Sequence, residues 1–218
     1  SIAHGASDTI TLPVTVTAAA VPSGSTSASL VNNASVGGSG DPFNGGTPPE
    51  PGAACTALDA TVPGHCATTS TTVYTEAALA ISKTFNSITQ TGLGQYQATY
   101  TVTVSNSGGV AGSYTLTDTP GFAAGVVLNG WTVTSAKGSV NAPLPALING
   151  VEHQISTTAT AIAAGDTHSY SVVITFTASS STAAASLTCS GTPGNGAYNA
   201  ASIGSAAPAA SACGALPG

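Results

Sequence analysis

The sequence predicts an all-β protein whose main domain is an antiparallel β-sandwich. Two segments, residues 96–105 and 170–178, alternate between apolar and polar side chains, which is the period of a half-buried strand. Turn-forming links such as Ser107-Gly108-Gly109 separate the strand candidates, and no segment has convincing helical periodicity. Short strands joined by turns are typical of two packed antiparallel sheets.

About seven strands are expected in the main domain. The two alternating segments are the clearest, and the others are shorter apolar runs bounded by turn residues. In chain order the expected strands are residues 79–85, 96–105, 113–119, 126–134, 152–158, 170–178 and 197–204. Trp131 alternates with Val133 and is expected in the core, whereas His153 and His168 are expected on the surface.

The beginning of the chain repeats its end. Residues 2–18 align without gaps on residues 162–178, and residues 30–37 align on residues 197–204. The apolar residues of these two early strands are Ile10, Leu12, Val14, Val16, Leu30 and Val36. Strands that lack their own sandwich leave open edges, which another chain or repeat can complete by strand donation.

This repeat predicts three regions. Residues 1–40 are expected to be the last strands of a preceding or partner domain, and residues 77–218 a complete sandwich. Between them, residues 41–76 are rich in Gly and Pro and are expected to form a linker that contains a cysteine pair.

Three blocks of the main domain resemble a known family. They are Leu-Ala-Ile-Ser-Lys-Thr at 79–84, Tyr-Thr-Val-Thr-Val-Ser-Asn-Ser-Gly at 100–108 and Thr-Leu-Thr-Asp-Thr-Pro-Gly at 115–121. In this order they are similar to a bacterial Ig-like repeat family, the eleventh of a catalogued series of domains of unknown function, which occurs in tandem on large surface proteins. The resemblance implies an Ig-like sandwich that serves as a structural module, and it implies no particular chemistry.

Composition excludes several functions. Charged residues make up 5% of the chain, with two Lys or Arg and a net charge of −6. Two basic residues cannot neutralise a run of phosphates, so no nucleic-acid partner is expected. No apolar run reaches the ~18 residues that a membrane helix needs. Isolated acids, the absence of a Cys-x-x-Cys pair and the absence of a Gly-x-Ser-x-Gly elbow predict no metal, no cofactor and no enzyme.

The four cysteines, Cys55, Cys66, Cys189 and Cys213, predict disulfides and therefore an extracellular or cell-surface location. Pairing of near neighbours, Cys55 with Cys66 and Cys189 with Cys213, is the simplest arrangement. A bond between Cys66 and one of the later cysteines remains the alternative.

Strand parity brings together three groups that can react with one another. Lys83, Asp118 and Asn199 all have the inward parity of their expected strands. Sandwich domains of Gram-positive pilins form an intramolecular isopeptide crosslink from a similar set. This similarity implies a Lys83–Asn199 bond assisted by Asp118, with Glu152 as the alternative acid. The other interpretation is a Lys83–Asp118 ion pair beside an Asn199 that bonds to backbone.

The expected function is structural. The chain is interpreted as a subunit or repeat of an extracellular filament, sheath or stalk, whose partners are copies of itself, because a charge-poor surface does little to resist self-association. The alternative is an adhesin-type binding module that recognises a glycan or a host surface. That alternative requires an exposed aromatic platform, for which Tyr114, Phe122 and Trp131 are the candidates.

Overall fold

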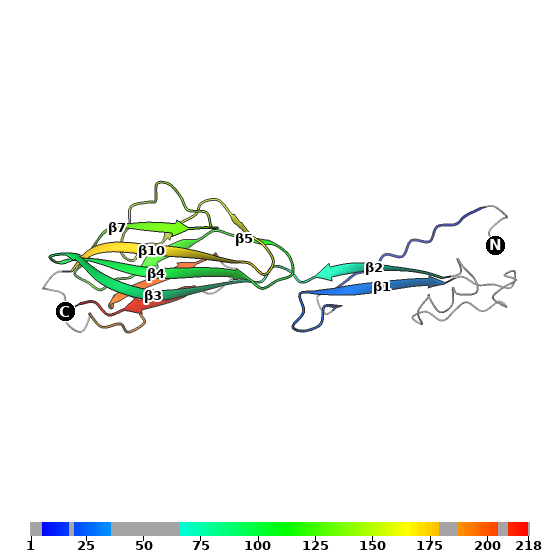
Figure 1. Ribbon diagram of the computed structural model, residues 1–218, viewed down its shortest axis with the longest axis horizontal. Helices are drawn as coiled ribbons and strands as arrows, with labels where there is room; N and C mark the ends of the chain where they lie inside the picture. The colour runs from blue at the N-terminus through cyan, green and yellow to red at the C-terminus, as the bar shows by residue number, and fades with distance from the viewer. Residues whose placement is uncertain (1–5, 18–19, 36–65, 179–186, 205–208, 218) are drawn as a thin grey trace. The chain divides into compact units, whose positions relative to one another are not determined.

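A computed structural model of the chain describes residues 6–17, 20–35, 66–178, 187–204 and 209–217 (Figure 1). The chain divides into two compact units, Ser1–Thr75 and Glu76–Gly218. The division falls beside the predicted boundary between residues 76 and 77. Both units are built from β-strands, and the described residues contain no helical element.

The second unit is an antiparallel β-sandwich, as the alternating segments predict. One sheet has the strand order β3 (Leu79–Gly92), β4 (Gln95–Asn106), β10 (Thr167–Ala178) and β7 (Val126–Ser135). The other has the order β12 (Ala210–Gly214), β11 (Ala197–Ser202), β6 (Thr117–Pro120) and β8 (His153–Gln154). A short ladder joins β5 (Gly112–Tyr114) to β9 (Thr160–Ile162).

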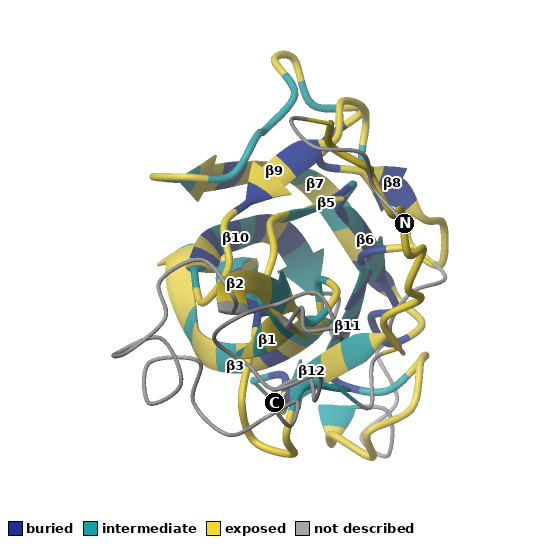
Figure 2. Ribbon diagram, turned by 90° about the vertical axis from the view of Figure 1, so that its right-hand side faces the viewer, coloured by how far each residue is buried: buried dark blue, intermediate teal, exposed yellow. Residues whose placement is uncertain are grey.

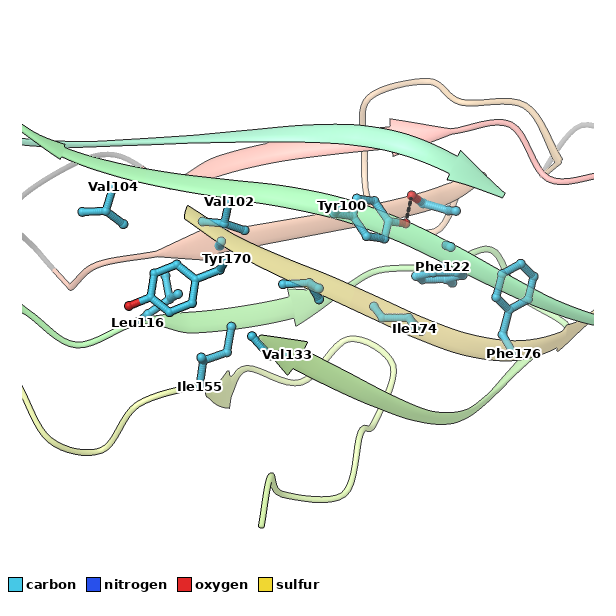
Figure 3. Packing of buried hydrophobic residues seen from close by; sticks show 14 of the residues in the cluster. Tyr100, Val102, Val104, Leu116, Phe122, Val133, Ile155, Tyr170, Ile174 and Phe176 are labelled. Atoms are coloured by element: carbon cyan, nitrogen blue, oxygen red, sulfur yellow. Dashed lines mark hydrogen bonds between the residues drawn. The ribbon is translucent and has the colours of Figure 1, made fainter. Parts of the chain in front are cut away.

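The core consists of the inward-facing residues of both sheets. The alternation along β4 and β10 buries one side of each strand over most of its length. Figure 2 shows the alternation of buried and less buried residues along β10. Figure 3 shows how these side chains pack against residues of the second sheet and its loops. Among the largest fully buried residues are Tyr100, Val102, Tyr170, Ile174, Phe176, Leu116, Phe122 and Ile155.

Several predicted strands differ in extent from the observed ones. The expected strand at 113–119 is divided into β5 and β6, and that at 152–158 is reduced to β8. The reason is local pairing around Leu116. Its backbone oxygen accepts hydrogen bonds from the amides of Ile155 and Ser156, and its own amide donates to the Ser156 side chain. The two segments therefore lie together without forming a continuous ladder.

The first unit corrects two predictions. Strand β1 (Ser27–Ser35) pairs with β2 (Cys66–Tyr74) in full register, so residues 66–74 are a strand and not part of a linker. The Thr-rich composition of β2 explains this, because β-branched residues favour strands. Residues 36–65, which include the rest of the predicted linker and Val36, lie outside the described residues. Residues 10–18 were expected to form a strand, yet residues 10–17 form none, because no strand among the described residues is hydrogen-bonded to them.

Candidate functional site

The candidate site lies inside the second unit, where three strands from two sheets contribute one polar side chain each. Lys83 is on β3 of the first sheet, Asp118 on β6 and Asn199 on β11 of the second. All three residues are buried, Asp118 and Asn199 completely. The inward parity predicted from the sequence for each residue therefore agrees with the structure.

Lys83 and Asp118 form a buried ion pair. The Lys83 Nζ donates a hydrogen bond to Asp118 Oδ2, and neither side chain has any exposed surface. Burial lowers the pKa of Lys83, because a charged amine loses its hydration, while the neighbouring Asp118 acts in the opposite direction. The ring of Tyr100 lies beneath the amine, with 5.3 Å between Nζ and the ring centroid.

Asn199 lies beside this pair without a hydrogen-bond partner. Neither its Oδ1 nor its Nδ2 is bonded, and Asp118 Oδ1 is unbonded as well. In the β6–β11 ladder Asp118 stands opposite Ala201, so Asn199 is its diagonal neighbour on the same face. The Lys83 Nζ also lies 3.4 Å from the backbone oxygen of Ala200, the residue after Asn199. The amine, the acid and the carboxamide thus meet in one dry site.

These contacts bear on the two interpretations of the sequence, the crosslink and the simple ion pair. The ion pair that the simpler interpretation requires is present, but its second element is wrong, since the Asn199 side chain does not bond to backbone. Glu152, the alternative acid, is exposed and so is not part of the site. An unbonded buried polar group costs about 1–3 kcal/mol, so the isolated Asn199 carboxamide requires an explanation.

Tyr100 belongs to the site and was missed as a functional residue. Its hydroxyl donates a 2.6 Å hydrogen bond to the backbone oxygen of Ala197 on β11, drawn in Figure 3, and its ring meets Phe85 edge-on at 5.6 Å. Burial, followed by the charge of Asp118, raises the pKa of Tyr100 above its ordinary value. The available signal was an inward-facing tyrosine, because a buried phenol needs a polar partner.

The second lysine provides an internal contrast. Lys137 pairs with Asp166 at 2.5 Å, but more than half of the Lys137 side chain and about a third of the Asp166 side chain are exposed. Solvent competes with such a pair, which therefore contributes little to stability. Only the Lys83–Asp118 pair, of the two lysine–carboxylate pairs among the described residues, is shielded from water.

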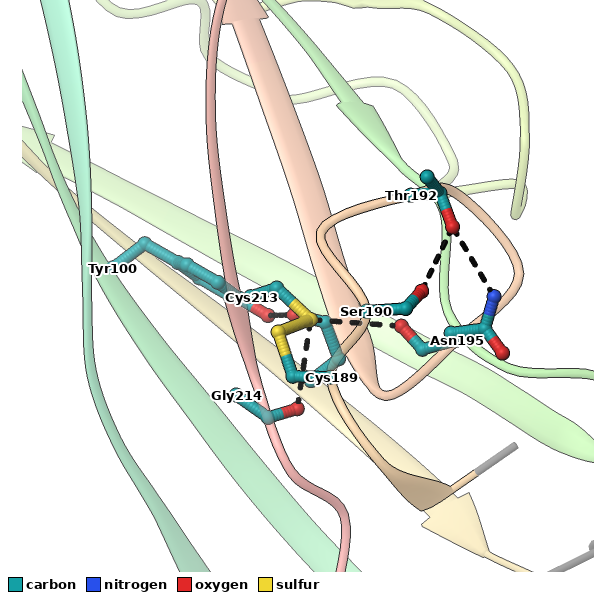
Figure 4. Close-up of a disulfide and its surroundings, with 8 residues drawn as sticks. Tyr100, Cys189, Ser190, Thr192, Asn195, Cys213 and Gly214 are labelled. Carbon is teal, nitrogen blue, oxygen red and sulfur yellow. Dashed lines mark hydrogen bonds between the residues drawn. A yellow bond between two sulfur atoms is a disulfide. The ribbon is translucent and has the colours of Figure 1, made fainter. Parts of the chain in front are cut away.

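A disulfide lies near the start of β11, the end of the strand to which Tyr100 is bonded. The structure joins Cys189 to Cys213 on β12, the pairing of near neighbours that the spacing favours (Figure 4). The bond ties the segment before β11 to the strand after it, next to Tyr100. Cys55 lies outside the described residues, and Cys66 begins β2.

The two histidines predicted at the surface are buried, which corrects that expectation. His168 Nδ1 lies 2.8 Å from the Tyr114 hydroxyl, which is also 2.8 Å from the Tyr170 hydroxyl. His153 Nε2 lies within hydrogen-bond distance of the backbone of Ile148. Both histidines share the parity of a neighbouring core residue, so the inward face continues further than expected.

The aromatic platform required by a glycan-binding adhesin is not formed by the candidate residues. Tyr114 and Phe122 are buried in the core. Trp131 is half-buried, packs against the core, and its Nε1 donates a 2.8 Å hydrogen bond to the backbone oxygen of Pro145. Its expected core position is therefore correct only in part.

The first unit exposes an apolar strip, defined here as Ile10, Leu12, Val14 and Val16. Ile10, Leu12 and Val14 are 84%, 78% and 83% exposed, whereas their repeat counterparts in β10, Tyr170, Val172 and Ile174, are fully buried. Leu12, Val14 and Val16 also line an apolar hollow together with Leu30 of β1 and Val73 of β2. The same sequence pattern is thus buried in one unit and uncovered in the other.

Comparison of the chain with known protein families, with characterised proteins and with solved structures finds no match. The resemblance to the Ig-like repeat family therefore stays a prediction. Within the described residues, no helix has the length and apolar character needed to cross a membrane.

Proposed function

We propose that the chain is a structural subunit or repeat of an extracellular filament, sheath or stalk, built from Ig-like sandwiches that are joined by strand complementation or by tandem linkage. The observation that carries this proposal is the apolar strip. Its residues are exposed, while the residues that match them in β10 are buried between β4 and β7.

The repeat identifies what would cover the strip. β10 pairs with β4 on one side and β7 on the other. By analogy, the strip would be covered by strands like β4 and β7 that another repeat of the same kind supplies. Covering a Leu, Ile or Val side chain contributes about 1.5–3 kcal/mol. Three residues of the strip are largely exposed, so the gain in free energy from covering the strip is correspondingly large.

Two other features support an extracellular structural role. The chain is poor in charge, with 5% charged residues, which favours packing of copies against one another. The Cys189–Cys213 disulfide fits an oxidising environment. No observation favours the binding-module alternative, since Tyr114 and Phe122 are covered.

The experiment compares self-association of matched variants. Light scattering after size-exclusion chromatography would be recorded over a range of concentrations for the wild-type chain, for Leu12→Asp with Val14→Asp, and for Thr9→Asp with Thr11→Asp. All four positions are exposed, but only the first pair places charge on the strip. Strand donation between copies predicts association of the wild type and of the threonine variant, and its loss in the Leu12/Val14 variant.

A second arm separates donation between copies from tandem linkage. If the wild type stays monomeric, a synthetic peptide of residues 95–106 is added, with a scrambled peptide as control. Binding of the β4 peptide, abolished by Leu12→Asp with Val14→Asp, would mean that a neighbouring repeat completes the strip. If the wild type neither self-associates nor binds the β4 peptide, strand complementation is overturned.

A further inference from the structure

We propose that the second unit closes its own sandwich covalently, by an isopeptide bond between Lys83 Nζ and Asn199 Cγ, with Asp118 as the proton carrier. The proposal concerns the interior of one chain, so it does not depend on any assembly. It rests on the meeting of three buried side chains from β3, β6 and β11.

The first step of the argument is position. Lys83 Nζ contacts Asp118 and lies 3.4 Å from the backbone oxygen of Ala200, so the amine reaches β11 directly beside Asn199. The site spans both sheets, and every participant comes from a paired strand that holds its backbone in place. Reacting groups that are fixed side by side do not pay the entropic cost of an encounter.

The second step is the unbonded carboxamide. Asn199 Oδ1 and Nδ2 have no partner, and an asparagine kept only for structure would be expected to bond to its surroundings. A carboxamide that instead lies free beside a buried amine is placed as an acceptor for nucleophilic attack. The unbonded Asp118 Oδ1 in the same site is available to exchange protons with it.

The third step is the chemistry, which needs no oxidant, metal or added reagent. Asp118 takes a proton from the Lys83 ammonium, and the resulting neutral amine attacks Asn199 Cγ. Asp118 then passes the proton to Nδ2 as the Cγ–Nδ2 bond breaks. The Nζ–Cγ amide forms, and the former Asn199 nitrogen leaves as ammonia; this ammonia takes up one of the two protons still on the attacking nitrogen and departs as ammonium, while the other proton stays as the amide N–H. Asp118 ends as a carboxylate beside the new amide N–H.

The site also meets the conditions under which such an amine reacts. Its surroundings are the Tyr100 ring and the packed core, so water does not compete for the amine or for Asn199. In such a site a proton shared between amine and acid is favoured over two separated charges. The exposed Lys137–Asp166 pair lacks both the shielding and a buried carboxamide beside it.

The decisive test uses trypsin on Lys137→Ala. The chain has two residues after which trypsin cuts, Lys83 and Lys137, and this variant leaves Lys83 alone. Trypsin recognises a free basic side chain, so an amidated Lys83 resists cleavage even in an unfolded chain. After folding, denaturation, reduction and digestion, the bond predicts one intact chain. Two fragments separated between Lys83 and Thr84 would overturn the proposal.

Intact mass spectrometry identifies the bond. After reduction of the disulfides, the wild type is expected to weigh less than its sequence mass by one ammonia. The full mass would overturn the proposal, and loss of one water would place the bond on Asp118 and overturn the assignment to Asn199. Succinimide formation at a pair such as Asn149-Gly150 also releases ammonia, but it leaves Lys83 cleavable, so the digest distinguishes the two.

Variants then assign the roles. In the Lys137→Ala background, Asn199→Ala is expected to restore both full mass and cleavage at Lys83. Asp118→Ala is expected to slow formation of the bond about a hundredfold, in line with the usual effect of losing a general acid–base group. Bond formation at the wild-type rate in Asp118→Ala would overturn the role of Asp118. Should either variant fail to fold, the digest and mass of Lys137→Ala alone still decide whether the bond exists.

Discussion

Lys83 and Asp118 come from opposite sheets of the sandwich and meet in a pair whose side chains are wholly buried. Such a pair connects the sheets, yet removal of two charges from water is costly, so it persists only where each partner compensates the other. Two consequences follow, one for stability and one for the chemistry of Asn199 beside it.

In the Asn199→Ala background, where Lys83 keeps a free amine, Asp118→Ala is expected to destabilise the second unit by about 3–5 kcal/mol, since it leaves a buried amine without its counter-charge. Burial already lowers the pKa of Lys83, and loss of Asp118 removes the influence that opposes this shift. A lysine whose pKa is lower in the folded than in the unfolded chain lowers the free energy of unfolding at pH values where it is charged. The stability of the variant should therefore rise with pH as Lys83 becomes neutral. Urea unfolding at several pH values measures this.

Lys137→Ala in the same background is the matched control, because it breaks the exposed lysine pair while Asp166 keeps its bond to the Thr167 amide. Little change is expected there, since solvent already screens that interaction. Equal losses of stability in the two variants would contradict the special position of the buried pair.

Tyr100→Phe tests the hydrogen bond across the sandwich to Ala197. The variant should lose about 1 kcal/mol near neutral pH, because the buried hydrogen bond from the hydroxyl to the Ala197 carbonyl is lost. The raised pKa of Tyr100 also has a consequence at high pH. Its stabilising effect is complete below the ordinary tyrosine pKa of about 10 and is lost as pH rises above it. Alkaline unfolding should therefore be less steep in Tyr100→Phe than in the wild type, and identical profiles would contradict this role.

Gly138→Ala tests the buried cluster of Tyr114, His168 and Tyr170. A Cβ at Gly138 would overlap the Tyr170 hydroxyl, which is bonded to Tyr114. We expect a loss of about 1–3 kcal/mol, as for other overpacked cores. Gly130→Ala is the control, since the nearest atom to its added Cβ is 3.8 Å away; Gly130 lies in β7, whereas Gly138 follows the end of that strand. Thermal unfolding of both variants gives the comparison, and a similar loss in each would contradict overlap with Tyr170 as the cause.

The sequence was sufficient to predict the sandwich and the inward positions of Lys83, Asp118 and Asn199, because both depend on the two-residue period of a strand. The partner of Tyr100 could not be predicted, since its bond to Ala197 crosses from one sheet to the other and depends on their relative position. Strand β2 was assigned to a linker because its Thr-rich run lacks apolar alternation. It forms a strand by pairing with β1, which is a tertiary effect.

The burial of the two histidines shows a second limit of prediction from the sequence. His168 has the same parity as Tyr170, and His153 the same as Ile155, so continuation of the pattern places both inward. Their polarity suggested otherwise, because burial requires partners that the sequence does not identify. Tyr114 and the backbone of Ile148 supply those partners. Polar residues next to a core strand are therefore better judged by parity than by polarity.

The proposed Lys83–Asn199 bond also predicts how the second unit responds to force. β3 is its first strand and β11 its penultimate one, so tension applied along the chain would pass from residue 83 directly to residue 199. After reduction of the Cys189–Cys213 disulfide, the wild type should extend only by the segments outside this loop. Asn199→Ala should release the enclosed segment as well and add about 400 Å, at roughly 3.5 Å per residue. Single-molecule force spectroscopy on both proteins measures the difference, with Lys137→Ala expected to behave as the wild type. Equal extensions of wild type and Asn199→Ala would show that tension is not carried by a covalent bond between these strands.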